Sequence, residues 1–217
     1  MVNQSTEDYL KSIYKLEQDG KTVATSVLAK HLNIGDGSVT DMMKKLSAKK
    51  LIQYVPYRGV SLTPRGRRLA LQMVRRHRLW EMFLVQFLGY SWDEIHDEAE
   101  RLEHVTSDEM ERRIDKALGY PKVDPHGDPI PDIDGGLEGI TYTPLTEFSQ
   151  GESVKIIRVS DENPEILQHA NKIGLTLNRK ITITKKLSFD GSMVVKIGVK
   201  EIFISQQVAR TIFVESV

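Results

Sequence analysis

The chain has 217 residues, of which 40% are hydrophobic, so it is long enough for one large domain or for two to three small domains with real cores. It contains no cysteine, which excludes disulfides, thiolate zinc sites and cysteine nucleophiles. No apolar run approaches the length of about 18 residues that a transmembrane helix needs, and the N-terminus lacks a secretion signal. We therefore expect a cytoplasmic protein without a membrane partner.

The net charge of zero conceals a strong segregation along the chain. Residues 1–80 hold 15 basic and 6 acidic side chains, a net charge of +9, whereas residues 81–140 hold 5 and 16, a net charge of −11. The remaining residues, 141–217, hold 10 and 8. This pattern favours a polyanionic partner for the first part and cations for the middle part.

The first part of the chain has the pattern of a winged helix-turn-helix. We predict an amphipathic helix over 5–18 with Ser5 as its N-cap, a short helix over 25–32 with Ser26 as its N-cap, and a helix over 38–51 after the turn 33–37. Residues 51–66 have the pattern of two strands around a turn at Arg58 and Gly59, which would form the wing. The alternative is a generic small helical domain that carries a hairpin.

The middle part is predicted to be helical. A long helix over 65–88 ends at Gly89 and carries more apolar positions than one domain face needs, which indicates an oligomer interface. Further helices are expected over 91–105 and 107–119, each opened by a serine cap, Ser91 and Ser107. Residues 120–139 are rich in proline and glycine and are typical of a linker.

From Thr146 onwards the sequence has β character. Five or so short strands are expected, with a short helix over 164–174 and a hairpin around Asp190 and Gly191. The predicted fold class is therefore multidomain α+β, with a winged helix-turn-helix over 1–70, a helical dimerisation domain with its linker over 71–139, and a small SH3-like β-barrel over 140–217.

The stretch HDEAERLEH, residues 96–104, concentrates potential metal ligands on one helical face. Its offsets bring four side chains within roughly 100° of one another on a helical wheel, namely His96, Glu100, Glu103 and His104. His77 and Glu81 repeat an i, i+4 pair on the preceding helix, and Asp8 can add another oxygen. Carboxylates mixed with imidazoles suit Mn²⁺ or Fe²⁺. The alternative is an ordinary salt-bridged surface that pairs Glu100 with Arg101 or Glu103 with Arg112.

Several of these stretches together resemble the DtxR/MntR family of metal-dependent transcriptional repressors over the whole chain. TEDYLKSIYKLE resembles their first helix, GSVTDMMKKL their recognition helix and YRGVSLTPRG their wing. RHRLWEMFL and IHDEAERLEHVTSDEMERRID resemble their metal-binding dimerisation domain, and PHGDPIP matches the segment that leaves it. The C-terminal part resembles the SH3-like, FeoA-type domain of the longer members.

This resemblance implies a primary activating metal site and a preferred metal. The implied ligands are Asp8, His77, Glu100, Glu103 and His104. Iron-responsive members carry methionine at the position of Asp8 and cysteine at that of Glu100, whereas both are oxygen donors here, as in the manganese-responsive branch. Because carboxylates favour Mn²⁺ over softer metals, the resemblance implies Mn²⁺ as the cofactor, with Fe²⁺ as the alternative.

A second metal site is also implied. Short manganese regulators carry a glutamate where this chain has Lys11, and a lysine cannot act as a ligand, so their paired-metal arrangement is not expected here. The longer regulators instead have a separate site, whose counterparts here are Glu81, Asp124, His126 and Asp161. His96 is a rival ligand. The alternative for Asp124 and His126 is a solvated linker loop.

The resemblance further implies a homodimeric repressor that binds double-stranded operator DNA and controls metal-uptake genes. Expected DNA contacts are at the start of the recognition helix, on the preceding helix and on the wing: Thr25, Ser26, Gly37, Ser38, Thr40, Asp41, Lys44, Lys45, Tyr57 and Arg58. The alternatives from other classes are a carboxylate-ligated metalloenzyme and an interaction module in metal handling that does not bind DNA.

Overall fold

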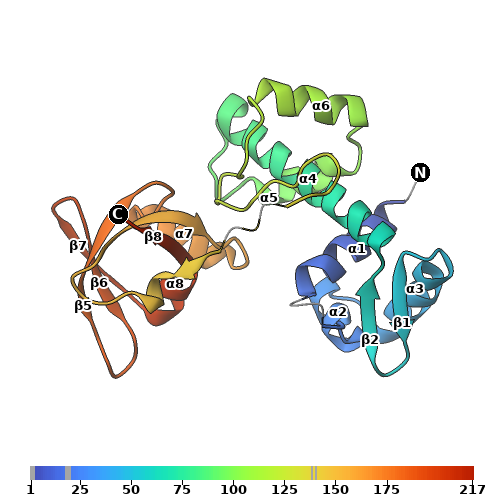
Figure 1. The fold of residues 1–217 in the computed structure, drawn as a ribbon, viewed down its shortest axis with the longest axis horizontal. Coiled ribbons are helices and arrows are strands. Elements are labelled where there is room, and N and C mark those ends of the chain that lie inside the picture. Colours follow the sequence, from blue (N-terminus) through green and yellow to red (C-terminus); the bar gives the residue numbers. More distant parts are fainter. Residues whose placement is uncertain (1–2, 18–20, 138, 140) are drawn as a thin grey trace.

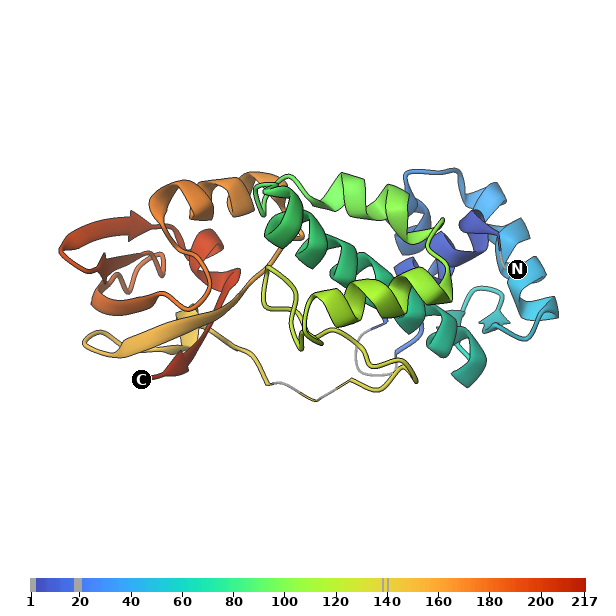
Figure 2. The same cartoon turned by 90° about the horizontal axis from the view of Figure 1, so that it is seen from above.

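The computed structural model describes residues 3–17, 21–137, 139 and 141–217. The chain is elongated, with a helical unit that carries a small hairpin at one end and a β-rich unit at the other (Figure 1). A long helix, α4, runs from the first unit into the middle of the molecule, where two shorter helices flank it (Figure 2).

The N-terminal unit packs three helices against a two-stranded hairpin. In chain order these are α1 (Gln4–Leu16), α2 (Thr25–Leu32), α3 (Asp36–Ala48), β1 (Ile52–Val55) and β2 (Gly59–Leu62). Its core is aliphatic, and Leu10, Ile13 and Met43 are fully buried there. An isolated bridge between Val23 and Val60 ties β2 to the segment that precedes α2. This order of helices and hairpin confirms the predicted winged helix-turn-helix.

Two predicted helix caps of this unit were wrong. Asn3, not Ser5, caps α1, because its side-chain oxygen accepts a hydrogen bond from the amide of Thr6. The helix α2 begins at Thr25 after Ala24 and has no side-chain cap, so Ser26 lies in its first turn instead of capping it.

The middle unit is built on α4 (Pro64–Leu88), which α5 (His96–Glu103) and α6 (Asp108–Ala117) flank. The chain can enter α4 tightly because Gly66 has no side chain: a Cβ there would lie 1.9 Å from the carbonyl oxygen of Leu51. The helix ends, as predicted, at Gly89, whose φ of 71° lies in the left-handed region. Residue 70 lies inside α4, which passes without a break from the first unit to the second.

The helix predicted over 91–105 starts later than expected. Ser91 does not cap it, because α5 begins at His96 and the residues before it form a turn. The Asp93 carboxylate accepts hydrogen bonds from the Ser91 hydroxyl and from Asn171, which lies on a helix of the C-terminal unit. These bonds hold the segment as a turn against that unit. Ser107 caps α6 as predicted.

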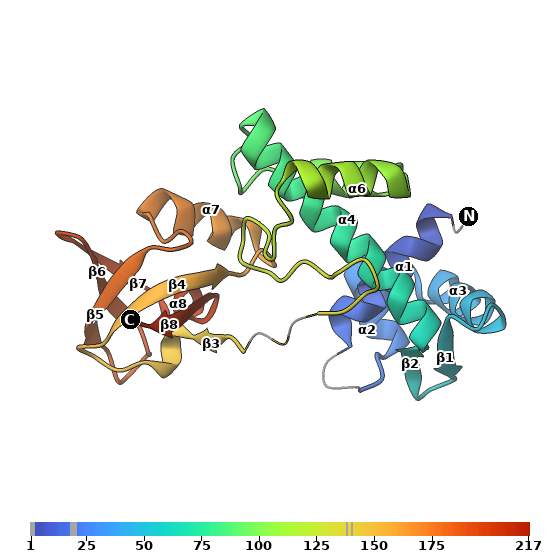
Figure 3. The same ribbon diagram turned by 45° about the horizontal axis from the view of Figure 1, so that its top comes forward.

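The C-terminal unit is a curved six-stranded antiparallel sheet in the order β3-β8-β4-β5-β6-β7, with an aliphatic core (Figure 3). Its elements are β3 (Thr143–Pro144), the 3-10 helix η1 (Leu145–Glu147), β4 (Ser153–Val159), α7 (Pro164–Ile173), β5 (Lys180–Lys186), β6 (Met193–Ile197), β7 (Lys200–Ile204), α8 (Gln206–Arg210) and β8 (Ile212–Ser216). The predicted hairpin around Asp190 and Gly191 is the one that joins β5 to β6. The SH3-like fold expected for this part is confirmed.

The linker packs closely on the C-terminal unit. The amide of Val159 in β4 donates to the carbonyl of His126, and a Cβ at Gly127 would lie 2.1 Å from the carbonyl oxygen of Ile157. The Arg158 guanidinium lies 3.0 Å from an oxygen of Asp128. The loop 124–128 is therefore fixed between the helical unit and β4. Over the described ranges, we find no helix with the length and apolar character that crossing a membrane requires.

Candidate metal centre

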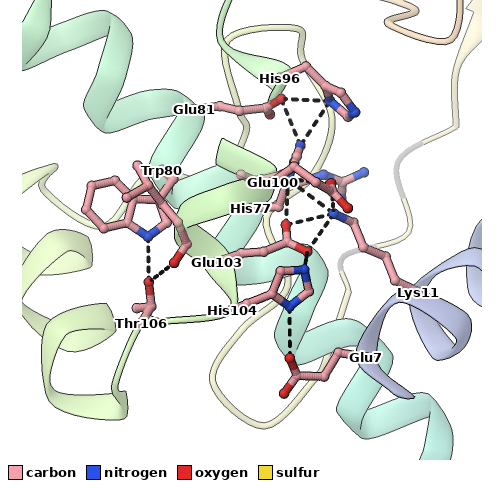
Figure 4. Close-up of polar contacts among 12 residues, drawn as sticks. Glu7, Lys11, His77, Trp80, Glu81, His96, Glu100, Glu103, His104 and Thr106 are labelled. Carbon is pink, nitrogen blue, oxygen red and sulfur yellow. Dashed lines mark hydrogen bonds and ion pairs between the residues drawn. The ribbon is translucent and has the colours of Figure 1, made fainter. Parts of the chain in front are cut away.

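The first candidate cluster lies where α1 passes α4 and α5 (Figure 4). Asp8 and Lys11 come from α1, His77 from α4, and Glu100 and Glu103 from α5. These elements are far apart in sequence, and the helical periodicity of each one turns its polar side chains towards the same space.

The Lys11 ammonium lies at the centre of this cluster. Its Nζ donates hydrogen bonds to Glu100 Oε2 at 2.7 Å and to both oxygens of Glu103 at 2.7 and 2.8 Å, and it lies 3.2 Å from His77 Nδ1. Lys11 is 4% exposed and Glu103 is fully buried. Burial raises the pKa of Glu100, but the nearby ammonium outweighs it and lowers that pKa to about 2. Lys11 thus supplies the positive charge that these carboxylates need in the absence of metal.

His104 faces Asp8 across the same cluster. Its Nδ1 lies 2.9 Å from an oxygen of Glu7, and because a carboxylate accepts, Nδ1 donates. The neutral ring then has its lone pair on Nε2, which lies 3.0 Å from Asp8 Oδ1. Within the described part of the chain, neither of these two buried atoms makes a hydrogen bond. A proton or a metal cation between these atoms would offset the repulsion of the two lone pairs, and their separation matches that of neighbouring ligands of an octahedral ion bound at roughly 2.1 Å, which lie roughly 3 Å apart.

A second cluster surrounds Glu81 of α4, which is 1% exposed. His77 Nε2 lies 3.1 Å from Glu81 Oε1 and 3.2 Å from His96 Nδ1, so His77 lies between the two clusters. Burial raises the pKa of Glu81, but His77 outweighs it and holds that pKa well below its usual range. Asp161, which follows β4, has a ligand atom within 4.8 Å of those of Glu81 and His96.

The linker contributes two buried residues to this second cluster. Ligand atoms of Glu81, Asp124 and His126 all lie within 4.8 Å of one another. His126 Nε2 donates to the carbonyl of Trp92 at 2.8 Å, so in the neutral ring Nδ1 carries the lone pair, 3.9 Å from Glu81 Oε2. This Nδ1 is buried and makes no hydrogen bond to any residue that the structure describes, whereas Glu81 Oε1, also buried, has His77 Nε2 as its neighbour at 3.1 Å. A histidine oriented by a carbonyl on its far nitrogen is the usual arrangement of a metal ligand.

Backbone amides and an arginine hold Asp124 in place. The amides of His126 and Asp128 donate to its Oδ1 at 2.8 and 2.9 Å, and the Arg78 guanidinium lies 3.4 Å from its Oδ2. Burial raises the pKa of Asp124 to about 7, with the neighbouring Glu81 and Asp128 carboxylates adding to the rise. Asp124 and His126 are 4% and 1% exposed, which contradicts the alternative of a solvated linker loop.

All ten predicted metal-ligand candidates therefore lie in one of these two adjoining clusters, which meet at His77. The salt-bridge partners expected in the alternative of a charged surface were wrong: Glu100 and Glu103 pair with Lys11, whereas Arg101 pairs with Glu98 and Arg112 with Glu109. The donors are carboxylates and imidazoles, a set that suits first-row divalent metals such as Mn²⁺ and Fe²⁺. The residues present thus fit a bound divalent metal, and the atoms without hydrogen bonds mark where it would be held.

Sequence reasoning missed three contributions to these clusters. Lys11 was treated only as a position that cannot ligate, and Glu7 was not considered. Both were accessible from helical spacing, because Glu7 and Lys11 stand four residues apart and share a face with Asp8. The role of Arg78 was not accessible in this way, because its carboxylate partners lie on the linker.

The predicted DNA-contacting residues lie on the exposed side of the N-terminal unit. Gly37 and Ser38 are exposed in the first turn of α3, and Asp41, Lys44 and Lys45 are exposed further along the same helix. Thr25 and Thr40 are half-buried, and Ser26 is exposed. At the tip of the wing, Arg58 is exposed and Tyr57 is fully exposed with a positive φ of 64°.

An apolar surface lies on the helical unit. At the end of α4, Phe87 is 54% exposed and stacks on Phe83, with ring centroids 4.9 Å apart. Leu88 beside it is also exposed, and Val105 and Met110 are exposed elsewhere on the unit. Large exposed apolar side chains are typical of a protein interface. A winged helix joined to a helical unit with metal-ligand clusters and exposed apolar side chains defines a metal-dependent DNA-binding regulator.

Comparison with known proteins gives the family. The chain matches the iron dependent repressor N-terminal DNA binding domain over residues 1–60, the iron dependent repressor metal binding and dimerisation domain over 63–132, and the FeoA domain over 143–216. The chain belongs to the family of DtxR/IdeR metal-dependent transcriptional repressors. It is a repressor and not an enzyme, so the metalloenzyme alternative and the alternative without DNA binding were wrong.

Relatives and solved structures match over almost the whole chain. The iron-dependent repressor IdeR of Mycobacterium leprae is 30% identical over 98% of this chain and 97% of its own length. The diphtheria toxin repressor of Corynebacterium jeikeium is 35% identical over 84% of this chain and 77% of its own. A manganese-dependent transcriptional repressor in complex with manganese is 38% identical, with a TM-score of 0.89 and coverage of 98% and 100%. ScaR with bound Cd²⁺ is 35% identical, with a TM-score of 0.82 and coverage of 98% and 99%.

Proposed function

We propose that this chain is a manganese-activated, homodimeric repressor that binds operator DNA of metal-uptake genes in the cytoplasm. The observation that carries the choice of metal is the donor set of the first cluster, where Asp8 and Glu100 present carboxylate oxygens and the chain has no cysteine. Hard oxygen donors with imidazole favour Mn²⁺ over softer metals. Similarity to a repressor described in complex with manganese supports the same choice.

The primary site of the proposal consists of Asp8, His77, Glu100, Glu103 and His104. Its two facing atoms, Asp8 Oδ1 and His104 Nε2, come from the DNA-binding unit and the helical unit respectively. A divalent cation supplies the positive charge that joins them. Asp8 is thereby fixed to α5, and α1, whose other face belongs to the core of the DNA-binding unit, is fixed with it.

The second site of the proposal consists of Glu81, Asp124, His126 and Asp161, with His96 at its edge. These four residues come from three segments: Glu81 from α4, Asp124 and His126 from the linker, and Asp161 from the C-terminal unit. Occupation of this site would hold the C-terminal unit against α4 and α5. Because each site joins two units, metal shifts the population of arrangements of one fold and does not create a new fold.

The DNA-binding surface of the proposal consists of α3, the start of α2 and the wing. Gly37, Ser38, Thr40 and Asp41 lie near the N-terminal end of α3, from which a recognition helix reaches base edges. Phosphate contacts are assigned to Lys44 and Lys45 on α3, Thr25 and Ser26 on α2, and Tyr57 and Arg58 on the wing. In a dimer, fixing α1 in each subunit sets the distance between the two recognition helices, which must match two half-sites.

An iron-responsive repressor is the second candidate, because curated relatives that are 30% identical over nearly the whole chain are named iron-dependent. Operator binding measured by fluorescence anisotropy in strictly anaerobic buffer with Mn²⁺ or Fe²⁺ separates the two. We expect tight binding with Mn²⁺ at lower free metal than with Fe²⁺, and loss of the metal effect in Glu103→Ala. Operator affinity that does not change with metal refutes metal activation, and a clear preference for Fe²⁺ refutes the manganese assignment.

A further inference from the structure

Lys11 occupies the oxygens that the primary site needs. Its ammonium takes both oxygens of Glu103 and one oxygen of Glu100, at 2.7–2.8 Å. An ammonium has three hydrogen-bond donors and no lone pair, so it competes with a metal ion for the same carboxylate lone pairs and cannot share the ion as a ligand. Lys11 is also buried, so its position among these groups is not that of a mobile surface lysine.

The backbone around Lys11 is fixed. Its neighbours on α1, Leu10 and Ile13, are fully buried in the core of the DNA-binding unit. The helix therefore cannot carry Lys11 away without disturbing that core, and the long side chain itself has to move. Asp8 lies one helical turn before Lys11, and its Oδ1 faces His104 instead of the ammonium. The same helix thus presents two different anchors to α5: a cation at Lys11 and a metal-ligating anion at Asp8.

We propose that Lys11 is a tethered cation that holds the primary cluster together in the metal-free chain and sets its metal affinity. Lys11 must release Glu100 and Glu103 before these carboxylates bind metal, and the α1–α5 connection then passes from Lys11 to Asp8. The metal-free chain is accordingly held together by an internal ion pair, and the carboxylates are not left to repel one another. This inference rests on the proposed function, because it concerns the regulation of the same site.

Amine labelling of the wild-type chain tests the release directly. The protein is acetylated briefly with an N-hydroxysuccinimide ester, with and without saturating Mn²⁺, and labelling of each lysine is quantified by mass spectrometry. Lys15, which is exposed on the same helix, is the internal control. We expect the labelling rate of Lys11 to rise about tenfold or more with Mn²⁺ while that of Lys15 stays constant. Unchanged or reduced labelling of Lys11, with Mn²⁺ binding verified in the same sample, overturns the inference.

Substitution tests the effect on affinity. Lys11→Met keeps the length of the side chain and removes its charge, and Lys30→Met removes an equal charge from the exposed surface of α2. Both are made in a His126→Ala background, so that Mn²⁺ titration reports the primary cluster. We expect Lys11→Met to bind Mn²⁺ about tenfold more tightly or better, and Lys30→Met to stay within about twofold, because only Lys11 competes for the ligands. Equal or weaker binding by Lys11→Met overturns the inference.

Lys11→Arg keeps the competing cation and is the second variant for the affinity test, to be used if Lys11→Met does not fold without metal. We expect Lys11→Arg to bind Mn²⁺ no more tightly than the parent, because a guanidinium also occupies the carboxylate oxygens. Tighter binding by Lys11→Arg overturns the inference. If the parent binds no Mn²⁺ at all, the proposed function fails and the inference fails with it, whereas Mn²⁺ binding without an effect of Lys11 refutes the inference alone.

Discussion

Glu103→Gln should destabilise the metal-free chain far more than an equivalent change on the surface. Glu103 is fully buried, and its two oxygens accept from Lys11 at 2.7 and 2.8 Å, with His77 Nδ1 at 2.6 Å. The glutamine keeps the shape of the side chain, removes the negative charge and turns one acceptor into a donor that faces an ammonium. Removal of one partner of a buried ion pair lowers the free energy of unfolding by about 3–5 kcal/mol, because the other charge is left buried and uncompensated. Lys11 retains Glu100, which is partly exposed, so we expect a loss of about 2–3 kcal/mol.

Urea unfolding in EDTA, followed by tryptophan fluorescence, measures this loss. Both tryptophans, Trp80 and Trp92, lie close to the candidate metal clusters, so the signal reports the region that the substitution affects. Glu109→Gln is the matched control: Glu109 pairs with two exposed arginines on α6, and because exposed ion pairs contribute little, its loss should leave the stability nearly unchanged. If Glu103→Gln is as stable as Glu109→Gln, the ion pair does not hold the metal-free cluster together and the reasoning is wrong.

Three further predictions concern the linker, the recognition helix and the pH dependence. Gly127→Ala should lower the free energy of unfolding by about 2–4 kcal/mol, because the Cβ would collide with the carbonyl of Ile157 and φ is +93°; urea unfolding tests it, and a neutral effect contradicts the close packing. Lys44→Ala should weaken operator binding about equally for different operator sequences. It should also reduce by about 1 the slope of the logarithm of the binding constant against the logarithm of the salt concentration, measured by fluorescence anisotropy over a salt series. A loss of affinity that depends on the operator sequence contradicts a phosphate contact. Because the pKa of Asp124 is raised from 3.8 to about 7, the folded chain binds the extra proton between these values, so metal-free stability should fall as pH rises from 5 to 7 by up to about 1 kcal/mol per unit. Asp124→Asn should flatten that fall in urea titrations at several pH values, and an unchanged slope refutes the assignment.

The sequence predicted the elements of the fold well, because strong periodicity and glycine stops define them. The winged helix, the end of α4 at Gly89 and the β5–β6 hairpin all follow from local signals. The start of α5 did not, because a bond from Asn171 in the distant C-terminal unit holds Asp93 in a turn. No local pattern contains that contact.

The candidate site was predictable in composition and less so in geometry. Helical spacing alone brought His96, Glu100, Glu103 and His104 onto one face, and the resemblance added Asp124 and His126 from a linker without periodicity. The charge balance of the cluster was not predicted. That balance depends on Lys11, whose partners on α5 follow it by about ninety residues, so only the packing of α1 on α5 reveals the pairing.

The double role of α1 has a thermodynamic consequence. One face of this helix belongs to the core that supports the recognition helix, and the other face reaches the metal-ligand clusters. If metal raises operator affinity through α1, operator DNA must raise metal affinity by the same factor, since coupling between two binding equilibria is reciprocal. Promoter-bound subunits would then retain metal at concentrations at which free subunits have already lost it. The free metal concentration that half-saturates an operator-bound subunit is accordingly lower than the one that half-saturates a free subunit, by the same factor by which metal raises operator affinity.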